Sequence, residues 1–251
     1  MVGPSALLIG FEDCDHCRNA LSVLESKGFN TSVCWASKKR KSPIPQMIKD
    51  WSGDYIFHLK SYHILPKKII ESAKNGVINF HPSPPRYPGS GGINRGLYND
   101  DKISGVTVHY MNEKVDNGSI ICFYKTDIEK QDNVKKLLSK VHKLQYDAFC
   151  DIIEKIVSNG TKFVADMSKS YDEEPWGEKT GRIKDIDQME IVTESTSKEE
   201  LERVIRATSI GAFGPKIILH NKNESPSTWS HRVRWEKFGS EAARKRVRSF
   251  C

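Results

Sequence analysis

Residues 77–89 read Val77-Ile-Asn-Phe-His-Pro-Ser-Pro-Pro-Arg-Tyr-Pro-Gly89, and this stretch decides the fold. The β-branched pair at its start predicts a strand, which delivers Asn79 and His81 into a loop rich in proline and glycine. A further strand is predicted at 104–110, and Asp116 follows it in a tight turn. An amide, an imidazole and a carboxylate at strand ends are the parts of a site that moves protons and stabilises an oxyanion. The chemistry is therefore expected between residues 77 and 118.

Outward from this stretch, the chain reads as a parallel α/β layer. Apolar and β-branched runs predict strands at 6–10, 29–35, 55–59, 77–80, 104–110 and 119–125, with helices at 17–24, 66–73 and 94–99. The turn after the first strand holds one glycine, Gly10, followed by the acidic pair Glu12 and Asp13. A dinucleotide fingerprint needs a glycine-rich turn, and acidic residues would repel a pyrophosphate. Nicotinamide or flavin binding is therefore not expected.

The second half of the sequence predicts one long helix and then a smaller module. Apolar residues at spacings of three and four predict a helix over 132–158, with Asp132 as its N-cap and Asn159-Gly160 as its end. Residues 168–187 are polar and rich in turns, and a helix at 198–208 and a strand within 211–219 follow. We therefore expect a catalytic domain at 1–166, a small α+β module at 167–230 and a basic tail at 231–251.

Composition and charge are those of a soluble globular protein, with 37% hydrophobic and 28% charged residues. No apolar run is long enough to span a bilayer, and residues 1–11 lack the features of a signal peptide, so a cytoplasmic protein without a membrane partner is expected. The net charge of +7 is concentrated in residues 231–251, which hold seven basic and two acidic side chains. Such a segment reads as appended or poorly ordered, and a basic tail alone is weak evidence for nucleic-acid binding.

The cysteine pattern leaves one motif open. Cys14-Asp-His-Cys17 could be a redox pair, half of a zinc site, or two small residues at a helix start. The chain has no second CxxC and no His-x-x-x-His partner, which favours the last reading, and no metal is expected. The other cysteines lie in or near apolar runs, as buried free thiols do.

The motifs Asn79-Phe-His81-Pro-Ser, Tyr87-Pro-Gly89, Gly105-Val-Thr-Val-His109 and Val115-Asp116-Asn-Gly118 resemble those of the 10-formyltetrahydrofolate-dependent formyltransferases. The resemblance covers residues 5–165 and implies a Rossmann-like α/β catalytic domain with 10-formyltetrahydrofolate as co-substrate. It also implies that Asn79 donates an N–H to the formyl oxygen and that His81 donates a proton nearby. Asp116 would orient His81 and take up the proton lost by the attacking amine, while His109 would support the acidic loop.

The same resemblance implies where the folate lies. Tyr62-His63-Ile64-Leu65 corresponds to the segment that holds the pterin ring through its backbone and apolar side chains. The loop from Asn112 to Val115 corresponds to the one whose carbonyls meet the amino and imino groups of the pterin. Ser83 completes the expected set of folate-binding residues.

The acceptor amine has to be inferred from the loop after His81 and from the second module. A glycinamide ribonucleotide enzyme would not need that module, and a methionyl-tRNA enzyme carries a larger, barrel-like one. The loop 84–94 and residues 201–213 are more similar to the branch that formylates nucleotide-linked amino-deoxysugars, as in lipopolysaccharide O-antigen biosynthesis. We therefore expect a sugar-nucleotide acceptor, bound by cations and aromatic platforms at Arg86, Tyr87, Arg95 and Trp176, each of which could instead be a surface or packing residue.

Other functions stay open. Methionyl-tRNA formylation is the main alternative, because the basic tail could attract a phosphate backbone. A formyltetrahydrofolate hydrolase would use the same three residues with water as nucleophile. An RNA-binding module without catalysis would leave Asn79, His81 and Asp116 unexplained. A homodimer is one option for the assembly.

Overall fold

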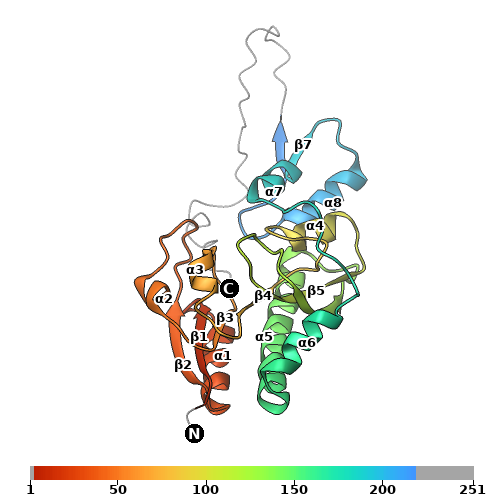
Figure 1. Ribbon diagram of the computed structural model, residues 1–251. Coiled ribbons are helices and arrows are strands. Elements are labelled where there is room, and N and C mark those ends of the chain that lie inside the picture. Colours follow the sequence, from red (N-terminus) through yellow and green to blue (C-terminus); the bar gives the residue numbers. More distant parts are fainter. Residues whose placement is uncertain (1–2, 219–251) are drawn as a thin grey trace.

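The computed structural model describes residues 3–218, and the basic tail expected at 231–251 lies outside them. A six-stranded sheet in the order β2-β1-β3-β4-β5-β6 forms its centre (Figure 1). The first four strands in that order are parallel, whereas β5 pairs antiparallel with both β4 and β6. The strands are β1 (Ser5–Gly10), β2 (Asn30–Trp35), β3 (Tyr55–His58), β4 (Val77–His81), β5 (Ile103–Tyr110) and β6 (Ile120–Asp127). This sheet with its covering helices confirms the expected Rossmann-like α/β class.

The longest helix, α5 (Val134–Asn159), packs against β4, β5, β6 and α1. It ends at Gly160 as expected, but its N-cap is Asn133, whose side chain accepts from the backbone N–H of Lys136. The prediction of Asp132 as N-cap was wrong, because that carboxylate instead accepts from the Glu129 backbone N–H and the Lys140 ammonium. The other helices of this part are α1 (Asp15–Ser26), α2 (Gln46–Asp50), α3 (Lys67–Ile70), α4 (Gly92–Tyr98) and α6 (Thr161–Ser170).

The core between α5 and the sheet is built on aromatic side chains. Phe149 of α5 meets Phe57 of β3 edge-on at 5.7 Å between ring centroids and Phe80 of β4 at 5.4 Å. Tyr55 stacks on Phe57 from the next position on the same face of β3. All four rings are almost fully buried, and truncating such a phenylalanine to alanine typically costs about 3–5 kcal/mol. The carboxyl ends of β3 and β4, where the expected chemistry lies, are thus held by a rigid core.

A second module follows, with α7 (Ile183–Met189), β7 (Ile191–Thr193), α8 (Lys198–Thr208) and β8 (Lys216–Ile218). The helix expected at 198–208 is confirmed, and it packs against α4 (Figure 1). The stretch 168–187 is not turns throughout, because α6 extends to Ser170 and α7 begins at Ile183, where the Arg182 backbone N–H donates to Asp185. The expected boundary at residue 166 falls inside α6, and the division into domains remains a prediction.

Residues 176–182, here called the strap, join the second module to the loop after β4. The backbone N–H of Gly177 donates to the Pro85 carbonyl, and that of Gly181 donates to the Pro88 carbonyl. Ser90 returns a backbone N–H to the Gly181 carbonyl at 2.9 Å. Gly89 has a φ of 80°, and a Cβ there would lie 2.4 Å from the Gly181 oxygen, so this crossing requires glycine.

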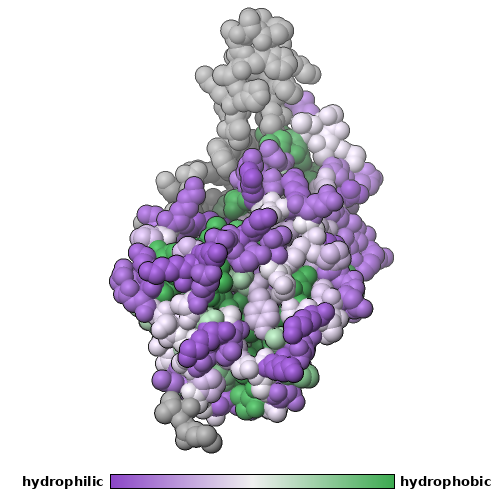
Figure 2. All heavy atoms as spheres, viewed as in Figure 1, coloured by the Kyte–Doolittle hydropathy of each residue, from purple (hydrophilic) through white to green (hydrophobic). Residues whose placement is uncertain are grey.

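The exterior carries mostly polar side chains. Figure 2 shows one face on which hydrophilic residues predominate and hydrophobic ones form small separate patches. Within residues 3–218, no helix has the length and apolar character needed to cross a membrane.

Candidate active site

A row of three side chains crosses the sheet at the ends of β3, β4 and β5. His58 is the register partner of Asn79, and Asn79 is the register partner of His109, so all three project from the same face. His58 Nδ1 lies 2.9 Å from Asn79 Oδ1, and Asn79 Nδ2 lies 2.9 Å from His109 Nε2. Two histidines thus hold the Asn79 amide from both sides.

The hydrogen bonds of the row have one consistent direction. The Tyr110 carbonyl can only accept, so His109 Nδ1–H donates to it at 2.9 Å and leaves His109 Nε2 free to accept from Asn79 Nδ2. On the other side, His58 Nδ1–H donates to Asn79 Oδ1. The Asn79 amide nitrogen therefore faces His109 and Asp116, whose Oδ1 lies 3.4 Å away.

His81 and Asp116 meet beside this row. His81 is two residues beyond Asn79 on β4 and so faces the same side of the sheet. Its Nε2–H donates to the Tyr87 carbonyl at 3.1 Å, and its Nδ1 lies 3.3 Å from Asp116 Oδ2. Asp116 stands in the loop after β5 with a φ of 42° and accepts the Gly89 backbone N–H at 2.8 Å. The structure therefore brings together the three residues expected to be catalytic.

The electrostatics of the pair favour a carboxylate beside a neutral imidazole. Burial would raise the pKa of Asp116, but the positive charge that His81 and His109 can take up beside it, together with the Gly89 N–H, outweighs burial and holds that pKa well below its usual range. Burial lowers the pKa of His81, while the Asp116 charge opposes that shift. Because both ring nitrogens of His81 face oxygen acceptors, a proton delivered to this pair has a binding place between His81 Nδ1 and Asp116.

A cleft of about 760 Å³ opens over these residues. Its lining includes the row, His81, Asp116, part of α5 and the end of the strap. Most of the expected folate-binding residues also line it, namely Tyr62, His63, Ile64, Ser83, Asn112 and Val115. The side chain of Leu65 is fully buried and does not line the cleft.

Several polar atoms in the cleft wall have no hydrogen-bond partner among the described residues. They are His58 Nε2, Lys60 Nζ, His63 Nε2, Ser83 Oγ and Gln145 Oε1. Gln145 uses its Nε2 to donate to the carbonyls of Leu59 and Phe80, which fixes the amide at the inner end of the cleft. Buried polar groups are normally paired, so a cluster of unpaired ones indicates a place where a ligand supplies the partners.

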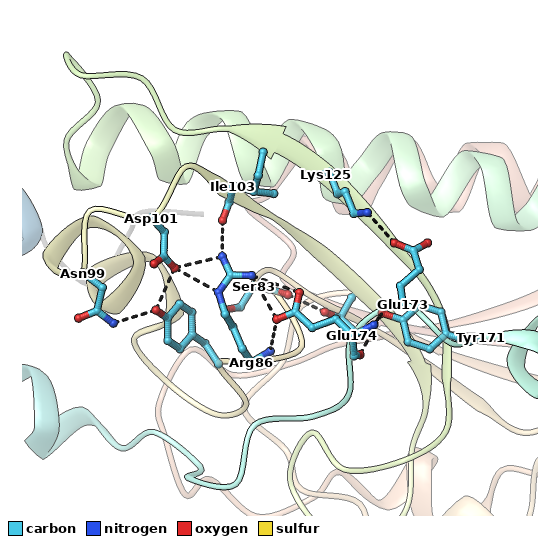
Figure 3. Close-up of polar contacts among 11 residues, drawn as sticks. Ser83, Arg86, Asn99, Asp101, Ile103, Lys125, Tyr171, Glu173 and Glu174 are labelled. Carbon is cyan, nitrogen blue, oxygen red and sulfur yellow. Dashed lines mark hydrogen bonds and ion pairs between the residues drawn. The ribbon is translucent and has the colours of Figure 1, made fainter.

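The four residues expected to bind the acceptor do not line the cleft, and Arg86 has acidic partners of its own. Figure 3 shows its guanidinium between Asp101 and Glu174, at 3.0 Å and 3.1 Å. A further N–H of Arg86 donates to the Ile103 carbonyl at 2.6 Å. With its charge compensated twice, Arg86 anchors the loop after β4 to the body of the protein and to residue 174.

Tyr87, Arg95 and Trp176 also make internal contacts. The guanidinium of Arg95 lies 4.7 Å from the centre of the Tyr87 ring and donates to the Pro88 carbonyl. Trp176 donates its indole N–H to the Gly118 carbonyl at 2.7 Å, and its ring meets that of His109 edge-on at 4.9 Å. Trp176 therefore packs against His109 and holds the loop that carries Asp116 through its Gly118 end.

The positive charge that lines the cleft was not predicted from the sequence. Arg40, Lys60, Lys114 and Arg182 are its cations, and among the lining residues Asp116 is the one carboxylate. Arg40 belongs to the basic run at 38–41, whereas Lys60, Lys114 and Arg182 come from three separate segments that no run of charge marks. Arg40 also lies over the Tyr62 ring at 4.2 Å from its centre. The cleft consequently suits a ligand that carries negative charge.

The Cys14-Asp-His-Cys17 motif lies at the start of α1. Cys14 and Cys17 are buried thiols, and the hydrogen bond between them, with burial, raises the pKa of Cys17. In the part of the chain that the structure describes, no group of three His, Cys, Asp or Glu residues is placed to hold a metal ion.

Similarity to known proteins agrees with this geometry. The methionyl-tRNA formyltransferase of Buchnera aphidicola subsp. Acyrthosiphon pisum is 30% identical over 173 residues, which is 68% of this chain and 51% of that protein. The chain thus spans about half the length of that relative.

Two solved structures share the fold over both parts of the chain. A 4-N formyltransferase from Francisella tularensis has a TM-score of 0.66 at 20% identity and covers 85% of this chain and 92% of its own. The N-formyltransferase from Helicobacter canadensis, in complex with folinic acid and dTDP-3-aminofucose, has a TM-score of 0.62 at 18% identity and covers 80% and 79%. The formyl transferase family model matches residues 9–153, and the chain therefore belongs to the formyl transferase family.

Proposed function

We propose that this protein transfers a formyl group from 10-formyltetrahydrofolate to the amine of a nucleotide-linked amino-deoxysugar, such as a 4-amino sugar. The observation that carries the proposal is the contact of Asn79, His81 and Asp116 at the floor of a cationic cleft. Together they provide an oxyanion donor and a proton acceptor within a few ångströms of each other.

The reaction follows from the positions of these groups. The acceptor amine adds to the formyl carbon, and Asp116 takes the proton that the nitrogen loses, with His81 Nδ1 next to it to share that proton. The formyl oxygen becomes an oxyanion and accepts an N–H from Asn79, in place of the long contact to Asp116. Collapse of the tetrahedral intermediate breaks the bond between the formyl carbon and N10 of the folate. N10 takes up a proton, and tetrahydrofolate leaves.

The inner part of the cleft fits a folate. Ile64 and Val115 are exposed apolar side chains on two separate segments of the cleft lining and can cover a flat ring. Among the described residues, Ser83 Oγ and Gln145 Oε1 are buried without hydrogen-bond partners, and a pterin carries donors and acceptors on its edge. The carboxylates of the folate tail would meet the cations near the mouth of the cleft, with Arg40 beside Tyr62 as the first of them.

The acceptor side points to a small anionic molecule. The end of the strap and α7 wall the cleft opposite the folate segment, through Thr180, Arg182 and Ile186. A cavity of about 760 Å³ is the size of a small-ligand site. The solved neighbours that share both parts of the chain include an enzyme in complex with dTDP-3-aminofucose, which supports a nucleotide sugar as the acceptor. We therefore assign binding of the acceptor's negative charge to Arg182 rather than to Arg86.

Methionyl-tRNA formylation is the second candidate, and the sequence relatives favour it. Methionyl-tRNA formyltransferases predominate among the matching sequences, at 30–34% identity. Their similarity covers up to 68% of this chain, so the second module has to decide between the two acceptors. A cytoplasmic location and a homodimer remain predictions.

A product assay separates the candidates. The purified chain and 10-formyltetrahydrofolate are offered nucleotide-linked 3-amino and 4-amino deoxysugars and, separately, methionyl-tRNA, and mass spectrometry detects the formylated product. We expect a formylated sugar nucleotide, and Asp116→Asn should abolish it. Formylation of the tRNA alone would replace our proposal by the second candidate. Release of formate without any acceptor would identify a hydrolase.

A further inference from the structure

The row of side chains across β3, β4 and β5 includes His58, to which the proposed mechanism assigns no role. We propose that His58 is a positioning residue for formyl transfer, which donates to Asn79 Oδ1 and so fixes the Asn79 amide nitrogen toward the reacting oxygen. The inference rests on the proposed function, because it assigns a role within that site.

The position of His58 follows from strand register rather than from a flexible loop. His58 is the last residue of β3 and pairs directly with Asn79 on the parallel strand β4. Its Nδ1 lies 2.9 Å from Asn79 Oδ1, and the side chain is 6% exposed. Among the described residues, this is the one side-chain hydrogen bond that Asn79 Oδ1 receives.

The direction of this hydrogen bond decides what Asn79 can do. With Oδ1 held by His58, the amide nitrogen points to His109 Nε2 and Asp116 Oδ1. A flipped amide would put its oxygen against the Asp116 carboxylate and remove the donor from the place where an oxyanion forms. Without His58, Oδ1 would be a buried acceptor with no partner, and the amide would gain by rotating toward water.

The protonation of His58 is compatible with this role. Burial lowers the pKa of His58, so the ring is neutral near pH 7 and carries a single proton. Nδ1 faces the oxygen of the Asn79 amide, whose nitrogen is turned to His109, and because that oxygen can only accept, the proton belongs on Nδ1. The groups that face this ring are Asn79, Asp116 and His63; Asn79 supplies the side-chain hydrogen bond at 2.9 Å, and the His63 backbone also lies within reach of the ring.

Two polar substitutions separate the donor from the bulk of the side chain. In His58→Asn the amide nitrogen can take the place of Nδ1, whereas in His58→Gln the amide reaches the place of Nε2 and leaves Asn79 Oδ1 without its donor. Tyr55→Phe is the matched control, because Tyr55 is on the same strand and also buried, and its hydroxyl has no hydrogen-bond partner among the described residues.

Steady-state kinetics with the formylated acceptor provide the first test. We expect His58→Gln to lower kcat about tenfold, as loss of one positioning hydrogen bond would, with the KM for 10-formyltetrahydrofolate within about twofold. His58→Asn should stay within about threefold of the parent, and Tyr55→Phe should match it. Equal kcat values in the Asn and Gln variants, or an unchanged kcat in the Gln variant, would overturn the inference.

A second readout does not depend on turnover. The side-chain amide signals of Asn79 in a ¹⁵N spectrum, assigned by their loss in Asn79→Asp, should exchange slowly with solvent in the parent and in His58→Asn. They should exchange at least about tenfold faster in His58→Gln. If no acceptor is formylated but this pattern appears, the proposed function fails and the positioning role stands. Identical exchange in all variants would disprove the role whatever the enzyme does.

Discussion

Asp116→Asn is the substitution that tests the site most directly. It keeps the shape of the side chain, and asparagine tolerates the φ of 42° found there. What it removes is a charge 3.3 Å from His81 Nδ1. With an effective dielectric constant of about 20, that charge stabilises a protonated His81 by about 5 kcal/mol, equivalent to between three and four pKa units. The variant loses both the group that accepts the amine proton and the partner that makes His81 a proton carrier.

We expect kcat for formyl transfer to fall about a thousandfold at pH 7, which lies within the range of rate factors that a general base contributes. The pKa of Asp116 lies below its usual value, so the parent carboxylate is ionised throughout the assay range and the loss should not depend on pH between 6 and 8. The assay is a single-turnover measurement at saturating 10-formyltetrahydrofolate. Asp100→Asn is the control, because Asp100 shares the positive φ but is exposed and away from the cleft. A kcat for Asp116→Asn within about tenfold of the parent would refute the assigned role.

Three further substitutions probe the surroundings of the site. Arg86→Lys removes the N–H groups that bind Glu174 and should lower the free energy of unfolding, measured in urea, by about 1–3 kcal/mol. An unchanged stability with a raised KM for the acceptor would instead show that Arg86 binds the acceptor. Gly89→Ala places a Cβ 2.4 Å from the Gly181 oxygen at a φ of 80° and should lower both the melting temperature and kcat; an unchanged melting temperature would contradict the close crossing. Burial, followed by the nearby Lys60, lowers the pKa of His142 to about 3, so the unfolded chain binds a proton below about pH 6.5 that the folded chain does not. Stability should therefore fall from pH 7.5 to 5.5, and His142→Gln should lose about 1 kcal/mol less in urea titrations, whereas an equal loss would exclude His142 as a cause.

The sequence was enough to predict the sheet, the long helix and the meeting of three polar residues. Asn79 and His81 lie at the end of a β-branched run, and Asp116 follows the next strand in a turn, so ordinary strand geometry predicts that they approach. The first residue of the long helix could not be predicted, because Asp132 and Asn133 are both good N-caps. The choice depends on Lys140, whose side chain binds Asp132 from eight residues further along the chain.

The contact partners of these residues could not be predicted from the sequence. His58 contacts Asn79 because β3 and β4 are adjacent in the sheet, and strand order is a property of the whole fold. Arg86 had the right charge for a phosphate, but Asp101 and Glu174, which neutralise it, come from segments 15 and 88 residues away. Long-range pairing of this kind leaves no local pattern from which it could be read.

Because of the row of His58, Asn79 and His109, the strands tolerate insertions much less well than the loops do. Its members are placed by strand register, so the insertion of one residue into β3, β4 or β5 would turn side chains to the opposite face and dismantle the row. The loop at 84–94 and the strap lie outside the strands, so exchanged residues there leave the register intact, provided that the Gly89 crossing and Asp116 are kept. A new acceptor can therefore be sought by rebuilding loops, while the half of the site that receives the formyl oxygen is inherited unchanged.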